Sequence, residues 1–265
     1  MKTRTLLQFA VAVLAIGGAP AIGGEAPLDH AASDRPHVVF VTGDDEYRSE
    51  ISMPMVARIL EERHGLRCTV LYAVDPSSGE RDPRCKRNIP GLEALETADL
   101  AVIFLRFREL PQEQFDRLLD FARSKKPLVG FRTSTHAFLY PAGNPLSEWN
   151  DRFGTEFFGQ KWITHHGHSS STAAAVIPER REHPVLRGVA GEFRCRSWLY
   201  HVDPLAGECL PLISGAAIGS EKNADQQRRF PLEQPVAWTK TDGGRRTFFT
   251  TLGHPADFEQ AAFRR

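Results

Sequence analysis

The chain has 265 residues, of which 41% are hydrophobic and 25% charged, values typical of a soluble globular protein that can bury a full core. Lysine plus arginine equals aspartate plus glutamate at 33 each, so the formal net charge is zero. This balance argues against a protein that binds nucleic acid or a membrane surface through clustered cations. We expect no nucleic-acid partner.

The first 21 residues have the pattern of a secretory signal peptide. Lys2 and Arg4 make a positive start, residues 6–16 are apolar, and small residues allow cleavage after Ala21. The apolar run is too short to span a bilayer, and no cysteine follows it to carry a lipid. We predict a secreted or periplasmic protein without a membrane anchor, with a flexible leader over residues 22–35.

From residue 36 onward, apolar runs alternate with amphipathic segments, which predicts one α/β domain over residues 36–265. We expect buried strands at 37–42, 68–72, 100–105 and 127–131, helices at 52–64 and 111–123, and a long loop at 75–90. Further strands are predicted at 172–177, 236–240 and 246–252. This order favours a flavodoxin-like parallel sheet with helices on both faces.

Four cysteines remain, and their state is open: they are Cys68, Cys85, Cys195 and Cys209. In an oxidising compartment they allow two disulfides, and a local bridge between Cys68 and Cys85 fits the predicted strand and loop. The alternative is reduced thiols, because a domain of this size does not need disulfides. None has the C-x-x-C spacing of a redox or zinc site.

Ligands of an open parallel sheet bind outside the carboxyl ends of its strands, so the residues after each strand are informative. The segments there are GDDEYR (43–48), RFR (106–108), RTSTH (132–136) and GHP (253–255). Acids, arginines, hydroxyls and histidines are therefore predicted to converge on one edge of the sheet.

Several of these groups also have a structural alternative. Asp44, Asp45 and Glu46 could cap the following helix, whose N-terminus favours negative charge, and Arg132 could form a structural ion pair. Ser134 lies in a turn that resembles a nucleophile elbow. The segment lacks the G-x-S-x-G glycines, so we predict hydrogen bonding by Ser134 instead of nucleophilic attack.

A cluster of imidazoles follows at His165, His166 and His168. Three histidines so close together could bind a metal ion, although adjacent histidines rarely point at the same ion. A metal-dependent hydrolase is therefore a third hypothesis, and our prediction contains no metal ligand and no cofactor.

The chain resembles the ThuA-like (trehalose-utilisation) family, which has a class I glutamine-amidotransferase-like α/β fold. The resemblance covers roughly residue 37 to the C-terminus. It rests on the order and spacing of several segments: VFVTGDDEY (39–47), ADLAVI (98–103), LVGFRTSTHAF (128–138), FGQKWITHHG (158–167), HPVLRG (183–188), WLYHVDPL (198–205), PVAWT (235–239) and TTLGHPADF (250–258).

The resemblance implies a connection with sugars, because ThuA-like proteins are associated with disaccharide use and with oxidised glycosides. True amidotransferases carry a nucleophilic cysteine at the elbow, where this chain has Arg132, Thr133 and Ser134. Glutaminase chemistry is therefore excluded on residue type. Relatives continue into a closing helix beyond Arg265, so that helix is absent here or the sequence is a fragment.

Two hypotheses follow, and both give the protein a small-molecule carbohydrate as its partner. The first is an exported enzyme that acts on a glycoside or keto-sugar by acid–base chemistry. Its predicted catalytic residues are His136, His166, Asp45 and Glu46, and its predicted substrate-binding residues are Arg132, Ser134, Trp162 and His254. The alternative is a non-catalytic module that binds a sugar or a partner protein on an amidotransferase-like scaffold.

Overall fold

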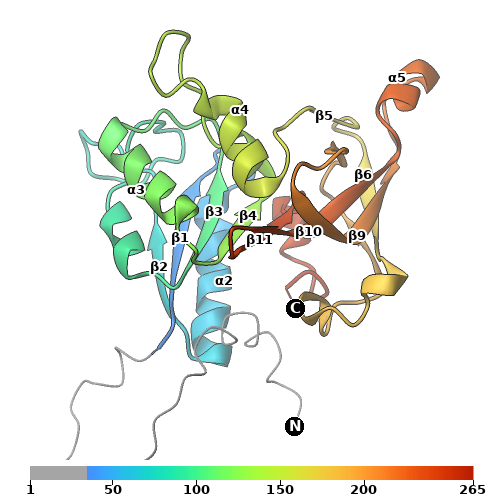
Figure 1. Ribbon diagram of the computed structural model, residues 1–265, viewed down its shortest axis with the longest axis horizontal. Coiled ribbons are helices and arrows are strands. Elements are labelled where there is room, and N and C mark those ends of the chain that lie inside the picture. The colour runs from blue at the N-terminus through green and yellow to red at the C-terminus, as the bar shows by residue number, and fades with distance from the viewer. Residues whose placement is uncertain (1–34, 265) are drawn as a thin grey trace, which may run out of the picture.

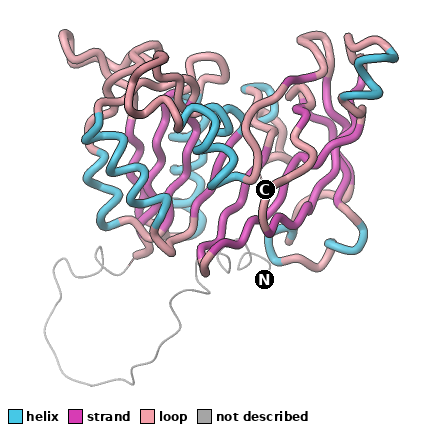
Figure 2. Tube along the Cα trace, turned by 45° about the horizontal axis from the view of Figure 1, so that its top comes forward, coloured by secondary structure: helices cyan, strands magenta, loops and turns pink. Residues whose placement is uncertain are grey.

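The computed structural model describes residues 35–264, so the predicted signal peptide and nearly all of the leader lie outside the described residues. A nine-stranded sheet runs through the molecule in the order β2-β1-β3-β4-β11-β10-β9-β6-β7 (Figure 1). The longest helices gather around one half of this sheet, and shorter helical segments lie at the other half, as Figure 2 shows in cyan.

Five neighbouring strands form the parallel half of the sheet. They are β1 (His37–Gly43), β2 (Arg67–Leu71), β3 (Leu100–Leu105), β4 (Leu128–Phe131) and β11 (Arg245–Thr250). Every residue of β1 is buried, because helices cover both faces of the sheet at this point. This explains why β1 is a continuous apolar run without polar alternation.

Alternate residues of these strands pack against different helices. Val38 and Phe40 contribute to the core beneath α2 (Ser49–His64). Val39 and Val41 contribute to the opposite core, under η2 (Leu92–Thr97), α3 (Gln112–Arg123) and α4 (Trp149–Phe153). The α/β class with helices on both faces is therefore confirmed, and the predicted elements of this half lie within a few residues of their expected bounds.

Beyond β11 the sheet continues in four antiparallel strands. Two of them match the strands predicted at 172–177 and 236–240, whereas the other two strands and the antiparallel pairing were not predicted. These are β10 (Glu233–Asp242), β9 (Glu208–Ile218), β6 (Ser171–Val176) and β7 (Glu192–Cys195). They enclose a separate core that includes Val176, Leu212 and Val236. The result is a mixed sheet, parallel at one end and antiparallel at the other.

Short elements connect the two halves and complete the described chain. A second, two-stranded sheet pairs β5 (Thr164–His165) with β8 (Tyr200–His201). The remaining elements are η3 (Arg132–His136), η4 (Gly154–Phe158), η5 (Pro178–Arg180), η6 (Pro184–Leu186), α5 (Ala224–Arg229) and η7 (Pro255–Asp257). No helix between residues 35 and 264 is long and apolar enough to cross a membrane.

All four cysteines are free. Cys195 is buried, and Cys68, Cys85 and Cys209 are partly buried. The bridge considered between Cys68 and Cys85 is not formed, so the structure has the reduced alternative.

Candidate functional site

The candidate site lies at the carboxyl ends of β1, β3, β4 and β11, which are neighbours in the sheet. The four segments that the sequence predicts to converge therefore begin on adjacent strands. Three residues that follow these strands, Arg48, Phe107 and Arg132, have positive φ angles of 55°, 51° and 42°. They are the non-glycine residues with positive φ in the described chain. Such strain is concentrated at functional sites, which supports this edge as the site.

Arg132 occupies the strained turn directly after β4 and is fully buried. Its Nη1 donates to the carbonyl oxygen of Thr251 at 2.8 Å, and its Nη2 donates to Tyr47 Oη at 3.0 Å. The guanidinium also lies over the rings of Tyr47 and Tyr200, 4.1 and 4.6 Å from their centroids. Arg132, and not Ser134, therefore holds the elbow position of this fold.

Aromatic and imidazole rings form a continuous series along this edge, which we call the ring arc: Phe107, His136, Trp162, His165 and Trp198. Successive ring centroids are 5.0, 5.5, 6.4 and 5.0 Å apart. Trp162 is 38% exposed, so one large ring face of the arc is open to a ligand. The ring arc joins four segments that are far apart in sequence.

Two further histidines adjoin the ring arc. The ring of His168 lies 4.3 Å from that of Trp198 and 5.0 Å from that of His165. His254 approaches the arc through Tyr47, whose ring lies 6.1 Å from His254 and 6.0 Å from Trp198. The predicted site residue His254 is thus near the arc, although its Nδ1 accepts the backbone N–H of Ala256.

Three imidazoles of this edge, those of His136, His165 and His254, are held in their neutral form. Burial, with the charges of Arg106 and Arg132, lowers the pKa of His136 to about 3. Burial, with the charges of His168 and Arg132, lowers the pKa of His165 to about 4. Burial and Arg132 also lower the pKa of His254, against the opposing charge of Asp257. A neutral imidazole can accept a proton or a hydrogen bond at neutral pH.

The acids that follow β1 have three different environments. Asp44 is buried, where its carboxylate accepts the backbone N–H groups of Glu46 and Tyr47 and the hydroxyl of Thr133. This carboxylate closes the turn that leads into α2. Burial raises the pKa of Asp44, and the hydrogen bond from Thr133 opposes that rise.

Asp45 is surrounded by cations. One of its oxygens lies 3.1 Å from Lys86 Nζ, 3.4 Å from Arg108 Nη2 and 3.5 Å from Arg106 Nη1. Burial alone would raise the pKa of Asp45, but the hydrogen bond and charge of Lys86 lower it overall, with help from Arg108. Asp45 is therefore an ion-paired carboxylate rather than a free base.

Glu46 contacts a single cation, since its Oε2 lies 2.8 Å from Arg106 Nη2. This carboxylate is one-third exposed, and its charge acts on both Tyr47 and His165. Of the two predicted catalytic acids, Glu46 is the one that lies beside the rings.

The structure does not bring two predicted residues into the site. Ser134 is fully buried, and its Oγ donates to the carbonyl oxygen of Ile103 at 2.8 Å. The imidazole of His166 is also buried, with Nδ1 2.9 Å from Ser220 Oγ and Nε2 3.0 Å from the carbonyl oxygen of Pro231. His165 therefore takes the place that we predicted for His166, because adjacent residues at the end of β5 point to opposite sides.

A close backbone contact fixes the turn that carries His136. A Cβ at Gly154 would collide with the carbonyl oxygen of Thr135, so only glycine allows α4 and η4 to approach η3 this closely. The segment Gly154–Phe158 is a single turn of π-helix, a feature that often occurs beside functional sites.

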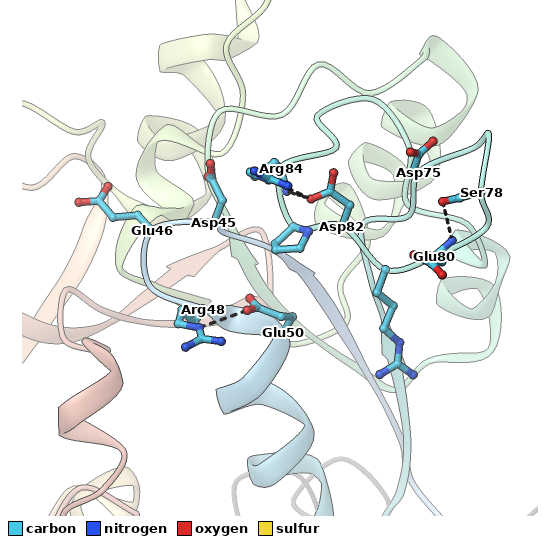
Figure 3. Close-up of a pocket in the computed structure, with 11 residues that line it drawn as sticks. Asp45, Glu46, Arg48, Glu50, Asp75, Ser78, Glu80, Asp82 and Arg84 are labelled. Atoms are coloured by element: carbon cyan, nitrogen blue, oxygen red, sulfur yellow. Dashed lines mark hydrogen bonds and ion pairs between the residues drawn. The ribbon is translucent and has the colours of Figure 1, made fainter.

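A charged cavity of about 560 Å³ adjoins the site between the start of α2 and the loop at 75–84. Figure 3 shows its ion pairs, Arg48 with Glu50 and Arg84 with Asp82, and shows Glu46 directed away from the 75–84 loop. The cavity is lined by Asp45, Glu46, Arg48, Glu50, Asp75, Ser78, Glu80, Arg81, Asp82, Pro83 and Arg84.

No role was predicted from the sequence for Tyr47 or Arg106, and His165 and His168 were considered only as possible metal ligands. The position of Tyr47 and Arg106 directly after a predicted strand was the signal that could have identified them. Within residues 35–264, no group of three or more histidine, cysteine, aspartate or glutamate side chains is placed to hold a metal ion. The histidine cluster does not converge, because His166 points away from His165 and His168.

No protein-family model matches this chain, and no curated protein matches it either. A crystal structure from Parabacteroides merdae ATCC 43184, of a protein assigned as ThuA-like, is similar over 83% of this chain and 80% of that chain. The sequence identity is 16% and the TM-score is 0.52. The fold is ThuA-like.

Two looser similarities concern larger proteins. The carbohydrate deacetylase Agd3 matches with 13% identity and a TM-score of 0.46, over 84% of this chain and 30% of that chain. The beta-galactosidase from Rahnella sp. R3 matches with 12% identity and a TM-score of 0.47, over 83% of this chain and 30% of that chain. This chain thus spans less than a third of either protein.

Proposed function

We propose that this protein binds a carbohydrate at the carboxyl edge of the sheet and acts on a glycoside or keto-sugar by acid–base chemistry. The observation that carries the proposal is the ring arc, in which the exposed indole of Trp162 lies beside His136, and Arg106, the partner of Glu46, lies over the ring of Phe107. A sugar ring has apolar C–H faces that pack on aromatic rings and hydroxyls that bond to charged groups. This edge offers both kinds of partner.

The chemistry follows from the state of the imidazoles. His136 and His165 are neutral at neutral pH because their pKa values are lowered to about 3 and about 4. A neutral imidazole can take a proton from a hydroxyl, a water molecule or an acidic C–H group. The ThuA-like fold adds the sugar connection that the resemblance implies, and export would bring the protein to sugars outside the cytoplasm.

Ligand binding and product formation test the proposal separately. We would titrate the protein with glucose, galactose, mannose and their methyl glycosides by calorimetry, and follow each mixture by proton NMR for new products. At least one sugar should bind, and Trp162→Ala should weaken its binding roughly tenfold to hundredfold through the lost ring packing. Leu232→Ala is the matched control, because Leu232 is also 38% exposed. Absence of binding to any sugar, or equal effects of both variants, would contradict the proposal.

A second candidate is the non-catalytic binding module. It is favoured by the occupied carboxylates, since Asp45 contacts three cations and Glu46 contacts Arg106. Under this alternative, a sugar binds to the ring arc and leaves unchanged. The NMR experiment discriminates the two, because a binding module yields ligand signals without product signals.

A further inference from the structure

Acid–base chemistry on a sugar needs a proton donor as well as a base, and His136 and His165 do not supply one. His136 and His165 carry no proton to donate as imidazolium at neutral pH. Asp45 is an ionised carboxylate among three cations, and its lowered pKa keeps it so. A different group near the ring arc must therefore protonate a departing oxygen.

Two tyrosine rings, Tyr47 and Tyr200, lie against the guanidinium of Arg132, and Tyr47 is the one whose hydroxyl forms a hydrogen bond with it. Its Oη accepts a hydrogen bond from Arg132 Nη2 at 3.0 Å, which leaves its own O–H free to donate elsewhere. The carboxylate of Glu46 lies near enough to raise the pKa of Tyr47. Because that carboxylate is one-third exposed, a ligand oxygen that enters beside it can accept the free O–H of Tyr47.

Arg132 is placed to stabilise the tyrosinate that proton donation would leave. It is fully buried, yet within residues 35–264 it forms no ion pair with a carboxylate; its partners are Tyr47 Oη and the carbonyl oxygens of Thr251 and Trp198. A buried guanidinium is ordinarily paired with an anion. Asp257 acts on Arg132 through space, but its carboxylate accepts the hydroxyl of Ser197 and backbone N–H groups.

The other charged and titratable groups around Tyr47 are arranged to keep it protonated before reaction. Burial raises the pKa of Tyr47, Glu46 adds to that rise, and Arg132 opposes it. His254 faces the ring in its neutral form, and Tyr200 lies on the other side of Arg132. Tyr47 is therefore a phenol at neutral pH, as a proton donor has to be.

We propose that Tyr47 is the proton donor of this site and that Arg132 is the positioning cation that stabilises its tyrosinate. The inference rests on the proposed function. When the C–O bond of a glycoside breaks, its electron pair stays on the leaving oxygen, which takes the proton of Tyr47 Oη. A water molecule attacks the sugar carbon and gives its proton to neutral His136 or His165. That proton returns to the tyrosinate through solvent beside Glu46, so the net reaction adds one water.

A comparison of leaving groups tests the proposal. An alkyl alcohol needs protonation to depart, whereas a nitrophenolate departs as a stable anion without it. Tyr47→Phe should therefore lower turnover of the methyl glycoside by about a hundredfold or more, and turnover of the 4-nitrophenyl glycoside of the same sugar by less than about tenfold. Tyr72→Phe is the matched control, because the Tyr72 ring also carries an arginine, Arg81, 3.7 Å from its centroid and is not part of the ring arc. It should change neither rate.

Variants at Arg132 complete the test. Arg132→Met should reproduce the selective loss on the methyl glycoside, and Arg132→Lys, which keeps the charge, should recover part of it. If Arg132→Met fails to fold, the comparison of wild type with Tyr47→Phe on the two glycosides decides alone, because Tyr47→Phe removes only one hydroxyl. Equal losses on both glycosides would overturn the role of Tyr47 and leave the proposed function standing. If the wild-type protein cleaves no glycoside, both the catalytic proposal and this inference fall.

Discussion

Ser134 Oγ lies 2.8 Å from the carbonyl oxygen of Ile103 and so joins the turn after β4 to the neighbouring strand β3. The same hydroxyl accepts the backbone N–H of Leu105 at 3.3 Å. The ladder between β3 and β4 ends at Ile103 and Gly130, so this hydroxyl replaces the strand partner that β4 no longer provides. Its role is to satisfy backbone groups that are buried.

We therefore predict that Ser134→Ala weakens folding and spares activity. Removing the hydroxyl leaves a buried N–H and a carbonyl oxygen without this partner, which costs about 1–3 kcal/mol in the free energy of unfolding. Urea denaturation measures this loss, with the exposed Ser78→Ala as control. Turnover or sugar binding should stay within about twofold of wild type. A loss of turnover by orders of magnitude with a trapped covalent adduct would restore Ser134 as a nucleophile.

His165 and His166 should respond to substitution in opposite ways. His165→Ala removes a ring of the arc, so turnover should fall by about a hundredfold to ten-thousandfold if it accepts a proton, while stability changes little. His166→Ala removes the partner of Ser220 and of the Pro231 carbonyl, so it should cost about 1–3 kcal/mol of unfolding free energy. Parallel activity and denaturation measurements on both variants check this. Full activity in His165→Ala would exclude it from the chemistry.

The parallel half of the fold was predictable because strands that are buried on both faces have continuous apolar sequences. β1 and β3 are nearly all apolar, and α3 places Phe115, Leu118 and Leu119 at helical spacing on its buried face. The antiparallel strand β9 lacks such a signature. It contains Pro211 and Gly215, which have low strand propensity, and Gly215 is required because a Cβ there would collide with Val236.

The candidate site was predictable in place but not in detail. Strand order alone brings the segments after β1, β3, β4 and β11 together, and that was available from the pattern of apolar runs. The choice between His165 and His166 depends on how the short strand β5 pairs with β8, where His165 is the partner of Tyr200. These two segments are distant in the chain, so local sequence does not encode their pairing. The ion pair of Asp45 with Lys86 likewise depends on where the 75–90 loop folds back.

Export gives a prediction about the segment that precedes the fold. We propose that the signal peptide is removed after Ala21, because the apolar run at 6–16 and the small residues at 19–21 fit a signal peptidase site. Expressed with an intact secretion pathway, the protein should then begin at Ile22, which N-terminal sequencing of the exported fraction would show. Protein that retains Met1 and stays in the cytoplasm would contradict export.

The pKa of His136 predicts how stability depends on pH. The group has a pKa of about 3 when folded and an ordinary value of 6.5 when unfolded. Between these values the unfolded chain binds a proton that the folded chain does not, so the free energy of unfolding falls as pH falls below 6.5. The slope from this one group approaches about 1.4 kcal/mol per pH unit well inside that window, and the contribution vanishes above it.

Urea denaturation of wild type and His136→Gln at pH 7, 6 and 5 isolates the contribution of His136 to the free energy of unfolding. Other groups, such as Asp44 with its raised pKa, titrate alike in both proteins and cancel in the difference. Wild type should lose stability relative to His136→Gln as pH falls, whereas Leu232→Ala should keep the wild-type slope. Identical slopes for wild type and His136→Gln would mean that the pKa of His136 is the same in the folded and unfolded chains, and the argument that His136 has no proton to donate would fail.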